Sequence, residues 1–585
     1  MKFKLINKPT SDFSPVQQIL YNRGIPPKEI EHYLKTTKDD ILDPISLGEE
    51  QIKRGVAAIV KSIQNSKKIL VIVDCDADGY TSAAALINYL IKIFPSSASL
   101  IDIRLHEGKE HGIEKEWLAD IAENYSLVIC PDSSSNDYFQ HKFLKDNGVT
   151  VLVLDHHEAD KISEDAIIIN NQLSNYKNKS LSGVGIVYKF CSYFDSMLGN
   201  NEADKMLDLV ALGNIGDMMD LRDFETKHLI GLGLSNIINP FFKGLVDRQS
   251  YSLGGSVTPI GVAFYIAPLL NATIRVGTSK EKEIMFRAMI DTLAYESVAS
   301  TKRGHKGEQE TVLDQAIRNG SNIRNRQKKV RDSGMELVEE VIKSNNLNKN
   351  KVLVVDTTDI VDKNLTGLVA NQIMAKYQKP TLLLRKVFNE EDGVEYMQGS
   401  GRGYDKSELN DFREFLIDSS MFEYASGHSS AFGAGIASSK IDKFIEYSNT
   451  KLDGYDFTAC YDVDYVYDAN NMNSQDIIDI GSMKALWGKG VDESFVAIKS
   501  IKVTSKNITL MSADRNPTIK ITLPNGISII KFGATKEEFD NLKSEKGYNE
   551  INVVGTCSLN EWQGRITPQI LVKEYEVVKK QEYYF

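Results

Sequence analysis

The sequence has few cysteines, no long apolar run and no excess of basic residues. Its five cysteines (Cys75, Cys130, Cys191, Cys460 and Cys557) are scattered and form no CxxC pair. This spacing predicts neither a disulfide framework nor a cysteine metal site. No uninterrupted apolar run reaches the roughly 18 residues that span a bilayer, and the first residues turn polar too soon for a signal peptide. We therefore expect a cytoplasmic protein that does not bind membranes.

The formal net charge is −11, so a basic surface over the whole molecule is absent. Proteins that only coat single strands obtain most of their affinity from Lys and Arg, and this sequence fits that class poorly. An enzyme is not excluded, because metal-binding carboxylates add to the negative count and bound dications reverse the local field. One basic cluster, residues 324–331, is typical both of a solvated helix face and of a nucleic-acid contact.

The chain of 585 residues is too long for one hydrophobic core. Alternating strand and helix patterns predict an α/β protein with a parallel sheet, followed by a long charged helix at 314–343, a second α/β unit and short strands of a β-barrel. We predict five segments: a helical N-terminal segment (1–66) that packs on the first α/β domain, that α/β domain (67–305), a connecting helix (306–348), a smaller α/β domain (349–453) and a β-barrel (454–585).

Carboxylates follow three of the predicted buried strands. Asp74, Asp76 and Asp78 come directly after the strand Ile69–Val73, with Gly79 permitting a tight turn. Asp132 follows the strand at 127–130, and the triplet 155–157 (Asp-His-His) follows the strand at 149–154. Strand ends of a parallel sheet meet at one edge, where ligands bind. An acidic surface turn is the plainer interpretation of one such loop, but three of them in one sheet indicate a cation site.

Mixed carboxylate and imidazole ligands without thiolate favour Mn²⁺, or Mg²⁺, over structural zinc. The number of ligands suits two ions about 3.5–4 Å apart, which can stabilise the attacking and leaving oxygens of a phosphodiester. The residues therefore predict a two-metal phosphoesterase.

Four motifs resemble those of the DHH phosphoesterases, and specifically of the RecJ-like single-strand-specific exonucleases. They are residues 76–79 (DADG), Asp132, residues 155–157 (DHH) and residues 211–217 (ALGNIGD). The resemblance implies a DHH catalytic domain, a DHHA1 substrate-binding domain and an oligonucleotide-binding (OB) fold. It implies the metal ligands Asp74, Asp76, Asp78, Asp132, His156 and Asp217, with Asp132 bridging the two ions.

The same resemblance implies catalytic roles for Asp155 and His157, where His157 holds the scissile phosphate and a hydroxide generated at the metals attacks it. Other stretches match the RecJ branch along nearly the whole chain: residues 19–25, 181–185, 266–275, 399–402, 427–433 and 560–564. Three positions depart from the pattern: Leu269 replaces an arginine, Ser133 to Ser135 replace a glycine-containing turn, and residues 214–216 are a variant of the fourth motif.

Five residues are candidates for substrate binding: His111, Arg275, Ser400, Arg402 and His428. Glycines beside the last three are expected to let backbone amides approach phosphate, with Arg402 and His428 supplying charge and donors. The alternatives are a solvated loop for His111 and a capping or packing role for Arg402 and His428.

The resemblance implies a monomeric 5′→3′ exonuclease of single-stranded DNA that releases 5′-mononucleotides in recombination, repair or replication. RNA as a substrate and a single-strand-binding protein or helicase as a partner stay open. The alternatives are a phosphodiesterase of short oligoribonucleotides or cyclic dinucleotides, and a non-catalytic replication scaffold. Relatives of the first kind generally lack the terminal barrel, and those of the second kind lose metal ligands that this chain keeps.

Overall fold

The computed structural model describes residues 1–585 apart from 109, 306, 391, 513–515 and 583–585. The chain forms two compact units, and each contains segments that are distant in the sequence. The first unit comprises Arg23–Asn325 and Met483–Glu493. The second comprises Met1–Asn22, Arg326–Ser482 and Ser494–Phe585. Each unit therefore depends on contacts between residues far apart along the chain.

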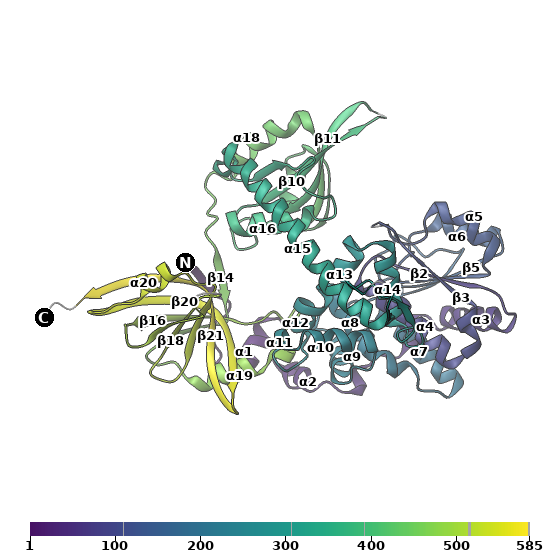
Figure 1. Ribbon diagram of the computed structural model, residues 1–585, viewed down its shortest axis with the longest axis horizontal. Helices are drawn as coiled ribbons and strands as arrows, with labels where there is room; N and C mark the ends of the chain where they lie inside the picture. The colour runs from purple at the N-terminus through teal and green to yellow at the C-terminus, as the bar shows by residue number, and fades with distance from the viewer. Residues whose placement is uncertain (109, 306, 391, 513–515, 583–585) are drawn as a thin grey trace. The chain divides into compact units, whose positions relative to one another are not determined.

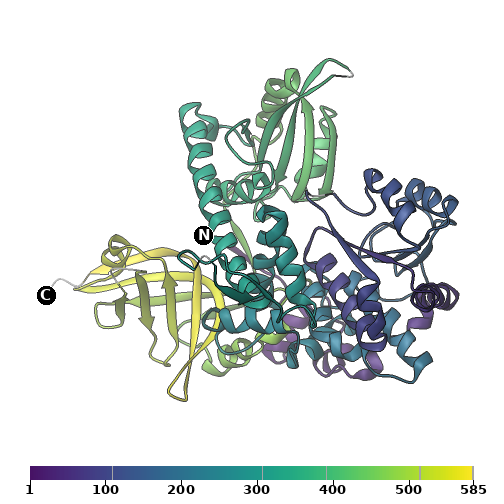
Figure 2. The ribbon, with the colours of Figure 1, turned by 45° about the vertical axis from the view of Figure 1, so that its right-hand side comes forward.

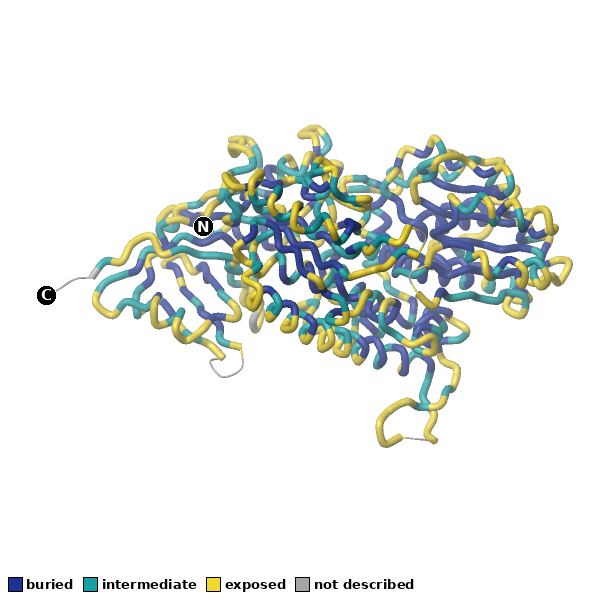
Figure 3. The backbone as a smooth tube through the Cα atoms, turned by 90° about the horizontal axis from the view of Figure 1, so that it is seen from above, coloured by how far each residue is buried: buried dark blue, intermediate teal, exposed yellow. Residues whose placement is uncertain are grey.

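A five-stranded sheet is the core of the first unit, with the strand order β3-β2-β4-β5-β6 (Figure 1). All four neighbouring pairs are parallel, which confirms the predicted parallel α/β fold. The strands β2 and β4 are buried along their whole length. Figure 3 draws buried backbone of this kind in dark blue. The strands are β2 (Ile69–Val73), β3 (Ile101–Leu105), β4 (Leu127–Pro131), β5 (Thr150–Asp155) and β6 (Ile167–Asn170).

Helices cover both faces of this sheet. Alternate residues such as Leu70, Val128 and Val151 face Leu118 of α5 and Leu144 of α6 in one apolar cluster. The intervening residues point to the opposite face, which is covered by helices that contact β2, β4, β5 and β6. The helices on the two faces are α5 (Leu118–Asn124) and α6 (Tyr138–Asp146), and α3 (Glu49–Gln64), α4 (Ala77–Ile93) and α7 (Gly183–Leu198).

More helices complete the first unit beside α4, and several of them contact it directly. Residues Met483–Glu493 return to this group, where the Leu221 amide donates to the Lys489 carbonyl over 2.9 Å. The helices are α2 (Ile30–Leu34), α8 (Leu207–Gly216), α9 (Phe224–Ser235), α10 (Pro240–Arg248), α11 (Ser250–Leu253), α12 (Pro259–Gly261), α13 (Ala267–Val276) and α14 (Ser279–Met289), with a π-helical turn at Val262–Ile266 and the short strands β7 (Ser297–Ala299) and β8 (Gln309–Thr311).

The predicted connecting helix is confirmed as α15 (Val312–Ser344), which has 33 residues. The division between the units falls inside it, at Asn325 and Arg326. A helix of this length without an internal proline keeps its hydrogen-bonding pattern throughout, so it provides a continuous backbone connection from one unit to the other.

The second unit contains the predicted smaller α/β fold, drawn in green in Figure 2. Its strand order is β12-β13-β11-β10-β9. Its core includes Leu382, Phe412 of α17, Phe432 and Phe444 of α18, and α16 contacts β10 and β11. The elements are β9 (Leu353–Asp356), α16 (Thr366–Tyr377), β10 (Thr381–Asn389), β11 (Val394–Arg402), α17 (Phe412–Asp418), β12 (Phe422–His428), β13 (Ala431–Ala437) and α18 (Ile441–Lys451).

The C-terminal part of the second unit is a seven-stranded sheet with the order β15-β16-β20-β21-β19-β18-β17. The short strands expected from the sequence lie within it, and residues 560–564 form the end of the long β20–β21 hairpin. The elements are β14 (Cys460–Val463), β15 (Tyr465–Asp468), α19 (Ser474–Ser482), β16 (Phe495–Val503), β17 (Ile508–Met511), β18 (Thr518–Thr522), β19 (Ser528–Phe532), α20 (Lys536–Leu542), β20 (Gly547–Trp562) and β21 (Arg565–Glu582).

The N-terminus differs from the helical pattern expected for residues 1–66. Its first residues form a strand, β1 (Lys2–Leu5), which pairs in parallel with β14. The helix α1 (Pro15–Asn22) contacts α19. Residues Met1–Asn22 thus belong to the second unit, and only the chain from Arg23 onward joins the first. The partner strand is more than 450 residues away, so no local sequence pattern predicts the pairing of β1 with β14.

Among the residues that the structure describes, one helical stretch, Pro259–Val276, is long and apolar enough to cross a membrane. The bent pair α9–α10 is a second candidate if the two helices count as one span. A buried core helix satisfies the same criterion, and 56% of Pro259–Val276 is buried within the fold. This stretch contains Asn271 and Arg275, so it is not an uninterrupted apolar run.

Candidate metal centre

The predicted acidic strand ends meet at one edge of the sheet of the first unit. The strand β2 pairs with β4, and β4 pairs with β5. Their carboxyl ends are therefore neighbours, and the residues that follow them converge. Ligand atoms of Asp74, Asp76 and Asp132 lie within 4.8 Å of one another, and so do those of Asp78, His156 and Asp217.

The loop after β2 is held by its own carboxylates. Asp76 caps α4, and its Oδ1 accepts the Gly79 amide over 2.9 Å. Gly79 lies in the first turn of α4, and a Cβ there would lie 2.6 Å from the Cβ of Asp74. The glycine is therefore needed for this close approach, not for a tight turn as the sequence suggested. Burial and then the neighbouring Asp78 raise the pKa of Asp76 to about 6.

Asp132 stands at the centre of the group and has the left-handed φ of +69°. Its amide donates to the Leu154 carbonyl over 2.7 Å, which fixes this turn to β5. The side chain is fully buried, and neither carboxylate oxygen has a hydrogen-bond partner among the described residues. Burial, followed by the charges of Asp78 and Asp76, raises the pKa of Asp132 well above its ordinary value. A cation is the physical complement that such a carboxylate requires.

Asp78 is held by the first turn of α7. It accepts hydrogen bonds from the Ser182 hydroxyl (3.0 Å), the Gly183 amide (2.6 Å) and the Val184 amide (3.2 Å). A Cβ on Gly183 would lie 2.3 Å from Oδ1 of Asp132. The glycine-rich turn at 181–185 therefore serves two ligands at once. Sequence similarity located this turn, but no local pattern shows which carboxylates it holds.

His156 and Asp217 complete the second group. The Nε2 of His156 lies 3.2 Å from Oδ1 of Asp132, 3.3 Å from Oδ2 of Asp217 and 3.9 Å from Oδ2 of Asp78. Burial lowers the pKa of His156, which favours the neutral imidazole that binds metals. Asp217 directly follows α8, and burial, together with Asp78, raises its pKa to about 8.

Asp155 belongs to neither of these groups and supports His157. Its Oδ1 lies 2.8 Å from Nδ1 of His157 and accepts the His156 amide, while its Oδ2 accepts the Ser135 amide. Burial alone would raise the pKa of Asp155, but the hydrogen bonds from His157 and Ser135 lower it to about 2. The same contact raises the pKa of His157 to about 9. His157 is half exposed, so a charged imidazole faces solvent beside the carboxylates.

The donor set fits divalent cations. Burial and neighbouring charges raise the pKa of three aspartates, Asp76, Asp132 and Asp217. The carboxylate oxygens of Asp132 and the Nε2 of His156 have no hydrogen-bond partner among the described residues. Oxygen ligands with one imidazole suit Mn²⁺ or Mg²⁺. Asp132 connects the two groups, because its Oδ1 is close to Nε2 of His156 and its carboxylate also belongs to the group of Asp74 and Asp76.

His111 also reaches the centre, from the loop after β3. Its Nδ1 lies 2.7 Å from Oδ2 of Asp74, and the Asp74 and Cys75 contacts raise its pKa to about 11. The side chain is 62% exposed. His111 is therefore tied to a proposed metal ligand and is not simply a solvated loop residue. Arg275 is exposed in the last turn of α13, and Leu269, at the position of the missing arginine, is buried in the same helix.

Ser400, Arg402 and His428 lie in the second unit. Arg402 and His428 both pair with Ala431 of β13, from its two sides. A Cβ on Gly367 would lie 2.6 Å from a guanidinium nitrogen of Arg402 and 3.5 Å from the Ser400 hydroxyl. Ser400 and Arg402 therefore face the N-terminal turn of α16, where the helix dipole attracts anions.

The role expected for Gly399 and Gly401 is wrong. Gly399 and Gly401 lie inside β11, which pairs with β10 on one side and β13 on the other. A Cβ on Gly399 would lie 2.0 Å from the Leu383 carbonyl oxygen, and one on Gly401 would lie 2.3 Å from the Phe432 ring. These glycines allow the close approach of strands and side chains, and their backbone does not form a phosphate cradle.

Comparisons with known proteins agree with this arrangement. The sequence profile of the DHH family, N-terminal domain, matches residues 68–214, and that of the RecJ OB domain matches residues 463–574. YorK of Bacillus subtilis (strain 168), which derives from the prophage SPbeta and is named as a single-strand DNA-specific exonuclease, is 36% identical over 585 residues, with 100% of this chain and 99% of YorK covered. RecJ of the same organism is 26% identical over 96% of this chain and 68% of RecJ.

A solved structure has the same fold. The crystal structure of RecJ in complex with Mn²⁺ from Thermus thermophilus superimposes with a TM-score of 0.70 at 17% identity, covering 99% of this chain and 80% of that one. Together with the similarity to YorK over the full length, this structural match identifies the family of the chain from its sequence and from its fold. The chain belongs to the DHH family, among the RecJ-like exonucleases, and is a metal-dependent nuclease.

Proposed function

We propose that the protein is a 5′→3′ exonuclease that degrades single-stranded DNA to 5′-mononucleotides with two divalent ions, Mn²⁺ or Mg²⁺. The single observation that carries the proposal is the pair of ligand groups around Asp132, whose carboxylate has no hydrogen-bond partner among the described residues. The names of YorK and RecJ support single-stranded DNA as the substrate. The polarity follows the RecJ resemblance.

Asp74, Asp76 and Asp132 would hold one ion, and Asp78, His156 and Asp217 the other, with Asp132 between them. When bound, the ions supply charge stabilisation for the attacking and leaving oxygens of the phosphodiester. The turn at 181–185 keeps Asp78 in place through three hydrogen bonds. This preorganisation avoids a rearrangement of the ligands during the reaction.

His157 would donate a hydrogen bond to a non-bridging oxygen of the scissile phosphate. Asp155 holds its Nδ1 over 2.8 Å, which leaves Nε2 as the donor toward substrate. Asp155 is thus a positioning residue, and His157 is a catalytic one. In the second unit, Ser400, Arg402 and the N-terminal turn of α16 would bind a phosphate of the strand, with His428 and, in the first unit, His111 and Arg275 as further contacts.

The test is digestion of DNA and RNA, single- and double-stranded and labelled at either end, with Mn²⁺, Mg²⁺ or a chelator. We expect metal-dependent release of mononucleotides from the 5′ end of single-stranded DNA, and no release by Asp132→Ala. Full activity of that variant would disprove the assignment of the centre. Cleavage of dinucleotides without cleavage of long strands would support the phosphodiesterase alternative instead.

A further inference from the structure

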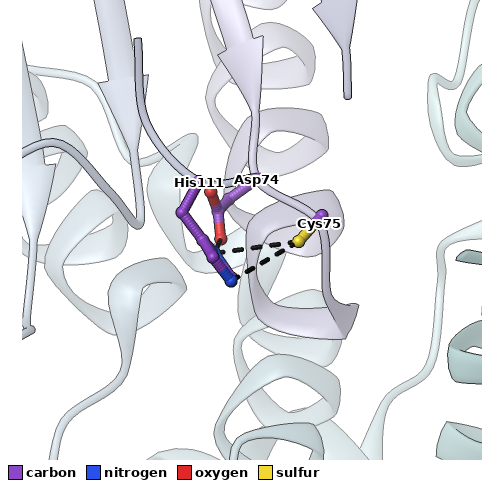
Figure 4. A group of neighbouring side chains, drawn as sticks. All are labelled: Asp74, Cys75 and His111. Atoms are coloured by element: carbon purple, nitrogen blue, oxygen red, sulfur yellow. Dashed lines mark hydrogen bonds and ion pairs between the residues drawn. The ribbon is translucent and has the colours of Figure 1, made fainter. Parts of the chain in front are cut away.

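The side chains of Asp74, Cys75 and His111 form a cluster of three different metal-binding groups at the edge of the catalytic centre (Figure 4). Asp74 and Cys75 follow β2, and His111 reaches them from the loop after β3. The Sγ of Cys75 lies 3.7 Å from Nδ1 and 3.6 Å from Nε2 of His111, and Oδ2 of Asp74 lies 2.7 Å from Nδ1. A thiol thus lies beside an imidazole and a buried carboxylate.

These separations match a zinc site closely. Zinc binds sulfur at about 2.3 Å and imidazole nitrogen at about 2.0–2.1 Å, so tetrahedral geometry places the two ligand atoms about 3.6 Å apart. The distance between Oδ2 of Asp74 and Nδ1 of His111 has to lengthen by only about 0.6 Å to match the oxygen–nitrogen separation in a tetrahedral zinc site. The exposed imidazole of His111 and the partly exposed Cys75 leave room for a water as the fourth ligand.

The thiol distinguishes this cluster from the two proposed catalytic groups, which contain only carboxylates and imidazole. Thiolate ligands select Zn²⁺ over Mn²⁺ and Mg²⁺. Asp74 belongs both to this cluster and to the group of Asp76 and Asp132. The two sites would share the single carboxylate of Asp74, and two dications held this close together repel each other. An ion at Cys75 and His111 therefore opposes the binding of the catalytic ion that Asp74 would hold.

We propose that Cys75, His111 and Asp74 form an inhibitory site for Zn²⁺, and that the bound ion withdraws Asp74 from the catalytic centre. Zinc replaces the proton of the thiol and that of the imidazole, and both protons go to solvent. For its effect on activity the inference rests on the proposed nuclease function, but binding of the ion does not depend on it.

Binding is tested on the full-length protein with Co²⁺ as a spectroscopic substitute for Zn²⁺, in the presence of saturating Mg²⁺. We expect a near-ultraviolet thiolate-to-cobalt charge-transfer band that Zn²⁺ abolishes. Cys75→Ser should lose the band, and Cys460→Ser, which removes the other partly exposed thiol, should keep it. Absence of the band from the parent protein, or its persistence in Cys75→Ser, would overturn the inference.

Inhibition is tested by titrating Zn²⁺ into the Mn²⁺-supported reaction. Cys75→Ser should keep its activity without zinc and need at least about tenfold more Zn²⁺ for half inhibition. Equal inhibition of both proteins would mean that zinc acts by displacing the catalytic ions, and would contradict the proposal. If the parent protein hydrolyses no nucleic acid at all, the proposed function fails, and the cobalt band still decides whether the site exists.

Discussion

At the scale of single residues, the centre brings together charges that the protein does not neutralise by itself. The side chain of Asp132 accepts no hydrogen bond from any described residue, and the charges of Asp78, Asp76 and Asp74 all act on it. Holding an ionised carboxylate in such a place costs free energy. The metal ligands should therefore weaken the metal-free fold, and this is the opposite of what buried residues usually do.

Replacing Asp132 with Asn should make the metal-free protein more stable and the enzyme inactive. The amide removes the buried charge without changing the shape of the side chain, so we expect a gain on the order of 1–3 kcal/mol in the free energy of unfolding. Thermal unfolding in a chelator, with and without added Mn²⁺, measures this. Mn²⁺ should stabilise the parent protein strongly and the variant much less, because binding to the folded state raises stability.

Asp146, which is 60% exposed on α6, offers the matched control. Asp146→Asn should leave hydrolysis and the response to Mn²⁺ unchanged. A metal-free Asp132→Asn protein that melts below its parent would show that the carboxylate is satisfied in a way the structure does not reveal, and the argument from charge would fail.

At the scale of elements, helix termini place the reactive groups. Asp76 caps α4, the first turn of α7 holds Asp78, and Asp217 directly follows α8. Sequence patterns predicted these helices, but their contacts with particular carboxylates depend on three-dimensional packing. The glycines at these termini are consequently constrained by neighbouring side chains as much as by their own backbone.

Gly183→Ala should damage the centre more than the fold. The added methyl group would lie 2.3 Å from the Asp132 carboxylate, and it would displace either this carboxylate or the amide that holds Asp78. We expect activity to fall by about 10²-fold or more, because misplacement by 1 Å is enough for such a loss. Steady-state kinetics over a range of Mn²⁺ concentrations would show whether metal affinity falls as well.

Gly231→Ala is the control for this substitution. Gly231 lies within α9, and a Cβ there meets no atom within 4 Å. Alanine should stabilise this helix by about 0.5–1 kcal/mol and leave activity unchanged. If both variants kept full activity, the contact between α7 and Asp132 would not matter for function.

The cap of α9 predicts a dependence of stability on pH. Asp223 accepts the amides of Glu225 and Thr226, and burial, with the nearby Glu225 charge, raises the Asp223 pKa to about 6. Its ordinary value is 3.8, so between about pH 4 and 6 the folded state binds more protons than the unfolded state. This residue therefore lowers stability as the pH rises through that window.

Asp223→Asn should remove this contribution, because asparagine is an equally good cap without a titrating group. Relative to the parent protein, the variant should gain on the order of 1 kcal/mol in the free energy of unfolding between pH 4 and 7. Urea unfolding at several pH values measures the difference. A difference that does not change with pH would contradict the raised pKa.

At the scale of the whole molecule, the strong local patterns were the ones that could be predicted. The apolar runs before Asp74 and Asp155 gave strands of the sheet, and the uninterrupted charged stretch gave α15. The pairing of β1 with β14 and the return of Met483–Glu493 to the first unit could not be predicted. They depend on contacts between residues hundreds of positions apart, which leave no periodic signal in either segment.

The candidate site likewise has features that could be predicted from the sequence and features that could not. The ligands could be identified because each follows a buried strand or belongs to a recognisable motif. The partners of Asp78 at Ser182 and Gly183, and the approach of His111 to Asp74 and Cys75, could not. The sequence shows these groups on separate loops, and only the packing of the sheet and its helices brings them into contact.

The net charge of −11 predicts that few phosphates are bound by basic side chains. Affinity should then depend only weakly on salt, since each phosphate contact contributes about 0.7 to the slope of log K against log salt for a single strand.

We propose that Arg402, beside Ser400 and the first turn of α16, makes one of these contacts. Arg402→Gln should reduce the slope by about 0.7, measured by fluorescence anisotropy with labelled single-stranded DNA on an Asp132→Asn background that cannot cut it. Lys451→Gln, an exposed charge at the end of α18, should leave the slope unchanged. Equal effects of the two substitutions would mean that Arg402 acts only through the general electrostatic field of the molecule. A steep slope in the unmodified protein would mean that basic residues concentrate along the bound DNA strand despite the negative net charge.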